Sequence, residues 1–128
     1  MQFNTSSPIY VQIAQYIQDL IINSVWVEED RIPSVRDMAM ELEVNPNTVI
    51  RTYSMLQEEG ILENQRGIGY FTAKGAKDLV LKKKRDHFIQ SELPNFFDSM
   101  RTLEITFEEI ETYFLLFKKE HNYHESQS

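Results

Sequence analysis

Residues 32–53 of this chain read IPSVRDMAMELEVNPNTVIRTY, and they predict two helices across a tight turn. Ser34, followed three residues later by Asp37, forms a capping-box-like start. The hydroxyl can accept a hydrogen bond from the first turn, and the carboxylate lies at the positive end of the helix dipole. An apolar stripe follows at helical spacing: Val35, Met38, Ala39 and Leu42. The stripe stops at residues 43–44, which predicts that the first helix ends there.

The second helix is predicted to begin about three residues after the first one ends. Asn45 is a favourable N-cap, and Pro46 fits the first helical position, where its missing N–H does no harm. Helical spacing places Val49, Tyr53 and Leu56 on the buried face of this helix. Asn47, Arg51 and Ser54 fall on the opposite, outward face. This pattern is typical of a helix-turn-helix, although an ordinary αα-corner has the same spacing.

A β-hairpin is predicted directly after the helix pair. Gly60 is expected to end the second helix, and residues 61–63 and 70–72 are expected to form strands around a turn at 64–69. The turn holds two glycines, which permit positive φ and a close approach of the backbone to a partner. Arg66 lies at the tip, where a cation can enter a minor groove or contact phosphates. A hairpin in this place is a wing.

An upstream helix is expected to pack beneath the other two. It starts at Ser7-Pro8 and runs to about residue 24. Its apolar stripe consists of Ile9, Ile13, Ile17, Leu20 and Ile21. Leu62 and Phe71 of the hairpin are expected to close the same small core.

The order of these motifs closely resembles the GntR family of bacterial transcription regulators. The resemblance covers residues 7–72 and rests on SPIYVQI, PSVRDMA, VNPNTV with a following Tyr, EGIL and RGIGYF. It implies a winged helix-turn-helix that binds double-stranded DNA. The chain departs from the family pattern in the loop after the first helix, where Val25 and Glu29 stand instead of the usual glycines. That loop is expected to be stiffer than usual.

The charge balance is unusual for a nucleic-acid binder. The net charge is −7, and the first 74 residues hold five Lys or Arg against ten Asp or Glu. Four of these five cations are expected near the DNA-reading elements. Arg36 and Arg51 fall in the two helices, Arg66 at the wing tip, and Lys74 in the strand just beyond it. A locally positive face on an acidic body is therefore expected. The absence of cysteine excludes disulfides and is compatible with the cytoplasm, and neither a signal peptide nor a membrane span is predicted.

Beyond residue 74 the composition changes to a helical pattern. A helix is predicted from about 76 to 100, with an interruption at Pro94, and it carries the basic run Lys82-Lys83-Lys84-Arg85. This run is either a solvated helix face or a flank that reaches DNA phosphates. Thr106 with Glu109 then forms a capping box for a last helix over about 107–120.

The C-terminal segment is unusually apolar. Between positions 93 and 117, 13 of 25 residues are large and apolar, and five of them are Phe. Two helices cannot bury that much surface against each other, which favours a second copy of the segment as the cover. The expected dimerisation residues are Leu93, Phe96, Phe97, Met100, Ile110, Tyr113, Phe114 and Phe117.

This layout is similar to the YtrA subfamily of GntR regulators, on length and helix count. The resemblance implies a short dimerising tail without a large effector domain, in repressors that often control membrane-transporter operons. A two-helix tail also leaves little room for a ligand pocket, although a ligand at the dimer interface stays open. The effector is therefore left unassigned.

No enzymatic machinery is evident in the sequence. A phosphate-binding loop, a nucleophile elbow and a carboxylate pair suited to acid–base work are all missing. His121 and His124 have a spacing that could ligate a metal, but they lie in a polar tail that is expected to fray. No cofactor and no metal are predicted.

The sequence therefore predicts a mostly α fold with a small β-hairpin wing. A winged helix-turn-helix DNA-binding domain is expected over residues 1–75, a helical dimerisation segment over 76–120, and a disordered polar tail over 121–128. The expected DNA-binding residues are Ser34, Arg36, Asn45, Pro46, Asn47, Thr48, Ile50, Arg51, Ser54, Gln65, Arg66 and Gly67.

The predicted function is that of a dimeric, cytoplasmic repressor at an inverted-repeat operator, with its own operon and a transporter operon as expected targets. The alternative is a winged helix that docks a protein without reading DNA, which the acidic balance would suit. The outward face of the second helix favours DNA, because its side chains are mostly hydrogen-bonding groups. Ile50 is the exception and can contact a thymine methyl.

Overall fold

The computed structural model describes residues 1–125, with side chains described for residues 1–122. Its elements, in chain order, are α1 (Ile9–Ile22), α2 (Val35–Leu42), α3 (Pro46–Glu58), β1 (Leu62–Gln65), β2 (Gly69–Thr72), α4 (Ala76–His87), a π-helical turn η1 (Phe88–Glu92), α5 (Leu93–Thr102) and α6 (Phe107–Glu125). The chain divides into two compact units after Arg85. The predicted fold class, mostly helical with one small hairpin, is confirmed.

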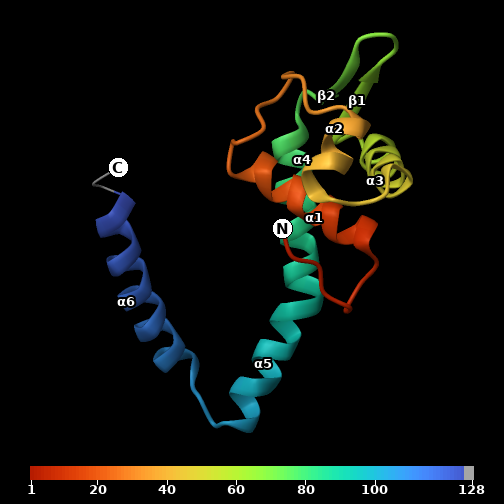
Figure 1. Ribbon diagram of the computed structural model, residues 1–128. Helices are drawn as coiled ribbons and strands as arrows, with labels where there is room; N and C mark the ends of the chain where they lie inside the picture. Colours follow the sequence, from red (N-terminus) through yellow and green to blue (C-terminus); the bar gives the residue numbers. More distant parts are fainter. Residues whose placement is uncertain (126–128) are drawn as a thin grey trace. The chain divides into compact units, whose positions relative to one another are not determined.

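Helix α3 packs against α1, α2 and β1 in the first unit (Figure 1). The core is filled by the apolar faces of the three helices, with Ile13, Ile17, Ile21, Met38, Val49, Tyr53 and Leu56 almost fully buried. The predicted stripe of α1 is confirmed in its middle, whereas Ile9 is exposed and Leu20 half-buried. Three residues separate α2 from α3, as predicted.

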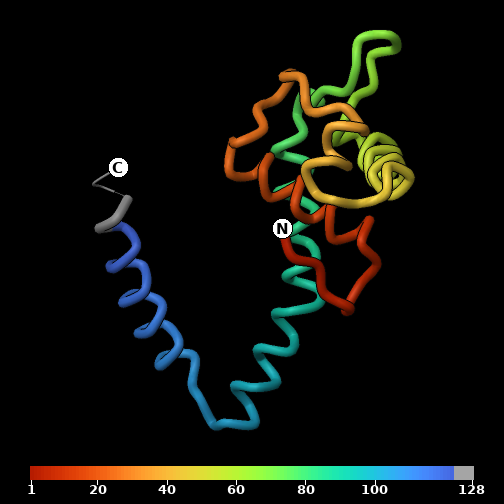
Figure 2. Tube along the Cα trace, viewed as in Figure 1, coloured from red at the N-terminus to blue at the C-terminus, as the bar shows by residue number. Residues whose placement is uncertain are grey.

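The wing is an antiparallel hairpin in which Leu62 pairs with Thr72 and Gln65 with Gly69. Its loop is shorter than expected, because Gln65 belongs to β1. Figure 2 shows this loop extending beyond the helices of the first unit. The segment before α2 continues the sheet on the other side of β2, where the Ile32 N–H donates to the Tyr70 carbonyl at 3.0 Å.

The prediction that Phe71 closes the core is wrong. Because Leu62 faces the core opposite Thr72, alternation along the strand places Tyr70, and not Phe71, on the same side. Tyr70 packs edge-on against Tyr53, with the ring centroids 4.9 Å apart. Phe71 is half-buried on the other face of the hairpin.

Helix α4 contributes to the core of the first unit. Ala76 and Val80 are fully buried in it, which explains why the compact unit continues to Arg85. The sequence placed the end of the DNA-binding domain at residue 75, before α4. In the structure the first turns of α4 pack into the core of the first unit. The sequence did not predict the burial of these two small apolar side chains, because most residues of α4 are charged.

Three non-glycine residues of the first unit, Ser24, Glu29 and Glu43, lie in the left-handed conformation, and two of them bear on the sequence expectations. Glu43 ends α2 at φ 56°, and the Val44 N–H donates back to the Ala39 carbonyl at 3.0 Å, which is a Schellman-type ending. Glu29, in the loop where the family usually has glycine, lies at φ 70°. Neither conformation is signalled by the local sequence.

The second unit begins with the interruption predicted at Pro94. The π-helical turn η1 precedes Pro94, which stands at the start of α5. Proline lacks the N–H that would continue the α-helical ladder, and a π-turn is a common way to accommodate that loss.

The capping box at the start of α6 is confirmed. The Glu109 N–H donates to Thr106 Oγ1 at 3.1 Å, and the Thr106 N–H points back to Glu109 Oε1 at 3.5 Å. Helix α6 extends to Glu125, so residues 121–125 of the predicted disordered tail continue the helix. The remainder of that tail, 126–128, lies outside the described residues.

Candidate nucleic-acid interface

The outward face of α3 is polar, as the sequence predicts. Most of the predicted contact residues on this helix and its cap are exposed: Asn45, Pro46, Asn47, Ile50, Arg51 and Ser54. Thr48 is half-buried. Hydrogen-bonding groups and one cation on an exposed helix can donate to and accept from base edges and phosphates.

Both helices of the predicted pair begin at the expected caps. Ser34 Oγ accepts a hydrogen bond from the Asp37 N–H at 3.1 Å, and Asn45 Oδ1 accepts one from the Asn47 N–H at 2.8 Å. Ser34 and Arg36 are exposed at the start of α2. The caps satisfy first-turn N–H groups locally, so the sequence alone could predict them.

The two helices are fastened to each other through a buried tyrosine. Tyr53, on the inner face of α3, donates from its hydroxyl to the Pro33 carbonyl at 2.8 Å. Burial raises the pKa of the Tyr53 phenol, and the nearby Tyr70, Glu41 and Asp37 raise it further. The neutral phenol is therefore the stable form, and it fixes where α2 begins relative to α3.

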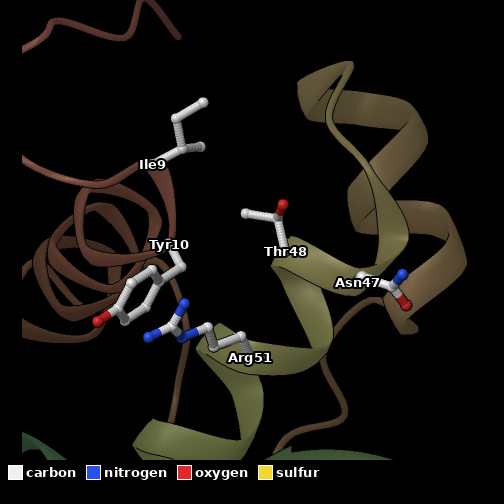
Figure 3. Close-up of a pocket in the computed structure, with 5 residues that line it drawn as sticks. All are labelled: Ile9, Tyr10, Asn47, Thr48 and Arg51. Carbon is white, nitrogen blue, oxygen red and sulfur yellow. The ribbon is translucent and has the colours of Figure 1, made fainter.

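A hollow of about 350 Å³ opens beside α3, and the sequence did not predict its α1 wall. It is lined by Ile9, Tyr10, Asn47, Thr48 and Arg51 (Figure 3). The Arg51 guanidinium lies over the Tyr10 ring, 3.8 Å from the ring centre. This is a cation–π contact, which joins the first turn of α1 to the outward face of α3. The only signal in the sequence was the Tyr of the SPIYVQI motif.

The wing presents its predicted residues at the tip. Arg66 and Gly67 are exposed in the loop, and Gln65 is half-buried at the end of β1. Gly67 has φ 80°, a conformation that favours glycine, and a Cβ there would meet no atom within 4 Å. The backbone at this position is open to a partner.

A further arginine joins the wing and was not predicted. Arg31 forms a β-bridge with Phe71, and its guanidinium lies against the wing at Gly69. A Cβ at position 69 would come within 3.0 Å of Arg31 Nε, and φ at this glycine is 143°. Glycine is therefore required at 69 both for its backbone conformation and for the close approach of the arginine.

The basic run 82–85 is partly engaged with the body of the first unit. Lys83 Nζ lies 2.8 Å from Glu59 Oε2, and Lys84 Nζ lies 3.0 Å from Asp19 Oδ1. These exposed ion pairs hold α4 against the ends of α3 and α1, and each contributes about 1 kcal/mol or less. At least two of the four cations, Lys83 and Lys84, therefore neutralise the protein's own carboxylates.

The second unit exposes the residues that the sequence assigns to dimerisation. No described side chain between residues 86 and 122 is buried. The five aromatic residues of the predicted set are 44–66% exposed: Phe96, Phe97, Tyr113, Phe114 and Phe117. The other three, Leu93, Met100 and Ile110, are half-buried. The described residues of the second unit thus leave an extended apolar surface on α5 and α6 exposed.

The described residues contain neither a metal-binding cluster of three or more His, Cys, Asp or Glu side chains nor a helix of the length and hydropathy needed to cross a membrane. The imidazole of His121 is stacked on Phe117, with the ring centroids 3.9 Å apart. The His124 side chain, the other half of the possible metal pair, lies outside the described side chains.

Comparison with known proteins agrees with this geometry. The sequence profile of the family described as "Bacterial regulatory proteins, gntR family" matches residues 9–72. The uncharacterised HTH-type transcriptional regulator YhcF of Bacillus subtilis is 39% identical over 109 residues, which cover 85% of this chain and 88% of that protein. The HTH-type transcriptional repressor YtrA of the same organism is 39% identical over 80 residues, 62% of each chain.

A solved structure shows the same fold over most of the chain. The crystal structure of a GntR-family regulator from Bacteroides thetaiotaomicron has 41% sequence identity and a TM-score of 0.78, and the match covers 89% of this chain and 99% of that one. The family match over residues 9–72 includes the helix pair and the wing, whose residues carry the polar face described above. The chain therefore belongs to the GntR family and is a transcriptional regulator with a DNA-binding winged helix-turn-helix domain.

Proposed function

We propose that this regulator is a dimeric, cytoplasmic repressor that binds an inverted-repeat operator. The observation that carries the proposal is the exposed polar face of α3, with Asn47, Arg51 and Ser54 directed away from a mostly apolar inner face. The buried core of a protein-docking surface is expected to be more apolar than this face and to be enriched in aromatic residues. The polar face therefore favours direct contact with DNA over the protein-interaction alternative.

Each predicted group has a definite task in this proposal. Helix α3 enters the major groove, where Arg51 and Asn47 meet base edges and Ile50 meets a thymine methyl. Arg36, near the N-terminus of α2, holds a phosphate. Arg66 at the exposed wing tip meets the adjacent groove, where the open backbone of Gly67 permits close approach.

The second unit supplies the dimer in this proposal. Its exposed phenylalanines would remain in water in a single chain, at a cost of about 1.5–3 kcal/mol for each large side chain that could otherwise be buried. A two-fold copy of the same apolar surface would cover them. Two recognition helices related by that axis read an inverted repeat, with half-site centres about ten base pairs or a multiple apart.

Repression is supported by the similarity to YtrA of Bacillus subtilis, which is an HTH-type transcriptional repressor. We infer that the operator lies upstream of the chain's own operon, and that a transporter operon is a second target. The test is an electrophoretic mobility shift with the DNA upstream of its own gene, compared with scrambled DNA of equal length and composition. A preferential shift supports the proposal. Equal binding to both fragments, or no binding, leaves the protein-docking alternative as the better account.

A further inference from the structure

Tyr10 and Arg51 are 41 positions apart in the sequence, yet they form one unit in the structure. The guanidinium carbon Cζ of Arg51 lies over the Tyr10 ring, 3.8 Å from its centre and well inside the range of a cation–π contact (Figure 3). A guanidinium over a ring keeps its N–H donors available, because they lie in its plane and point outward from its edge. Those donors are the groups that form bidentate hydrogen bonds.

The backbone of Tyr10 is held in place by α3. Thr52 is fully buried, and its Oγ1 lies 2.9 Å from the Tyr10 carbonyl and 3.1 Å from the Thr48 carbonyl. Thr52 follows Arg51 in the chain, so the residue that anchors the first turn of α1 is adjacent to the arginine that the ring supports. The backbone from which the Tyr10 ring projects is therefore fixed next to Arg51 by a buried contact.

We propose that Tyr10 is a positioning residue that orients the Arg51 guanidinium to read one guanine in each half-site. This inference rests on the proposed function. A bidentate contact to guanine O6 and N7 requires a planar donor pair in one orientation, which an unsupported arginine samples only part of the time. The hollow beside the stack, walled by Ile9 and Thr48, leaves room for a base edge next to the guanidinium.

The test uses the full-length protein and a pool of random-sequence duplexes. Selection with the parent identifies the preferred duplex, and Kd is then measured for duplexes in which each selected guanine is replaced. The readout at each position is the Kd for the duplex with the guanine replaced, divided by the Kd for the preferred duplex. The variants are Tyr10→Leu, Tyr10→Phe, Arg51→Lys and Arg51→Ala, with Tyr16→Leu as a control on the same helix, outside the hollow.

We expect the parent to discriminate about 10- to 100-fold at the guanine read by Arg51. Arg51→Ala and Arg51→Lys should lose this ratio, because lysine has no planar donor pair. Tyr10→Leu should lower the same ratio about tenfold, Tyr10→Phe should restore it, and Tyr16→Leu should leave it as in the parent. The double variant Tyr10→Leu/Arg51→Ala should match Arg51→Ala alone at that position.

Two outcomes would overturn the inference. The first is a Tyr10→Leu variant that weakens binding equally to all duplexes, which would make Tyr10 merely structural. The second is a guanine ratio that changes with Arg51 and not with Tyr10. Failure of the proposed function is a separate result, since a parent that selects no sequence would refute DNA readout whatever the Tyr10 variants do.

Discussion

The hydroxyl of Tyr53 donates a 2.8 Å hydrogen bond to the carbonyl of Pro33, and this bond ties the recognition helix α3 to the residue before the α2 cap. The phenol is fully buried, and burial raises its pKa above the ordinary value of 10.0. The helix pair is thus held by a group that is neutral throughout the physiological range.

Tyr53→Phe is expected to lower the unfolding free energy by about 1–2 kcal/mol at neutral pH, because the Pro33 carbonyl loses its donor. Below pH 10.0 both the folded and the unfolded chain keep the Tyr53 proton, so this group adds no pH dependence. Above that value the unfolded chain loses the proton first, and the unfolding free energy falls. Urea unfolding between about pH 8 and 11 should show the decrease in unfolding free energy that comes from ionisation of Tyr53 in the parent and not in the Phe variant. An equal fall in parent and variant would contradict the assignment.

Arg36→Ala, Arg51→Ala and Arg66→Ala should each weaken operator binding. The expected loss is about 1–3 kcal/mol for a bidentate base contact and less for a phosphate contact. Fluorescence anisotropy with labelled operator gives the Kd values, and circular dichroism verifies that each variant is folded. Lys118→Ala, which removes an exposed cation from α6, is the matched control. Parental affinity in all three arginine variants would refute this assignment of the reading face.

A chain cut after Arg85 is expected to stay folded and to be monomeric, whereas the full chain is a dimer. A chain cut after residue 74 should be less stable by about 2 kcal/mol or more, because it lacks the buried Ala76 and Val80. Size-exclusion chromatography with light scattering gives the masses, and thermal unfolding gives the stabilities. A full-length monomer at micromolar concentration would exclude the proposed dimer.

Replacing Lys82, Lys83, Lys84 and Arg85 by Gln should leave the salt dependence of operator binding unchanged. Lys83 and Lys84 pair with Glu59 and Asp19 of the same chain, so they release few counterions from DNA. The slope of log affinity against log salt is expected at about −5 to −9 for the dimer, or about −0.9 for each phosphate neutralised. Titrations across potassium chloride concentrations measure it. A shallower slope in the quadruple variant would place the run on phosphates.

Glu43→Gly should stabilise the fold by about 0.5–1 kcal/mol, because Glu43 ends α2 at positive φ, where a side chain is disfavoured. Glu41→Gly is the matched control. This residue is also an exposed glutamate of the same helix, but it lies within the helix, and glycine there should cost about 1 kcal/mol. Opposite signs in urea unfolding would confirm the turn geometry, and destabilisation by both would contradict it.

The sequence determined the parts of this protein that depend on neighbouring residues. The caps at Ser34 and Asn45 and the capping box at Thr106 each join groups two or three residues apart, so their residue types predict the helix starts. Helical spacing likewise identified the buried face of α3 and, by exclusion, the polar face. The family motifs lie in these same local elements.

Only the tertiary structure decided which distant residues meet. The Tyr10–Arg51 stack, the approach of Arg31 to Gly69 and the burial of Val80 all join segments that no local pattern relates. Strand register, rather than hydropathy, decided that Tyr70 and not Phe71 faces the core, because both are large aromatic residues and alternation gives only one of them that side. The left-handed turn at Glu43 has the same origin: packing of α2 against α3 overrides the preference of a glutamate for negative φ.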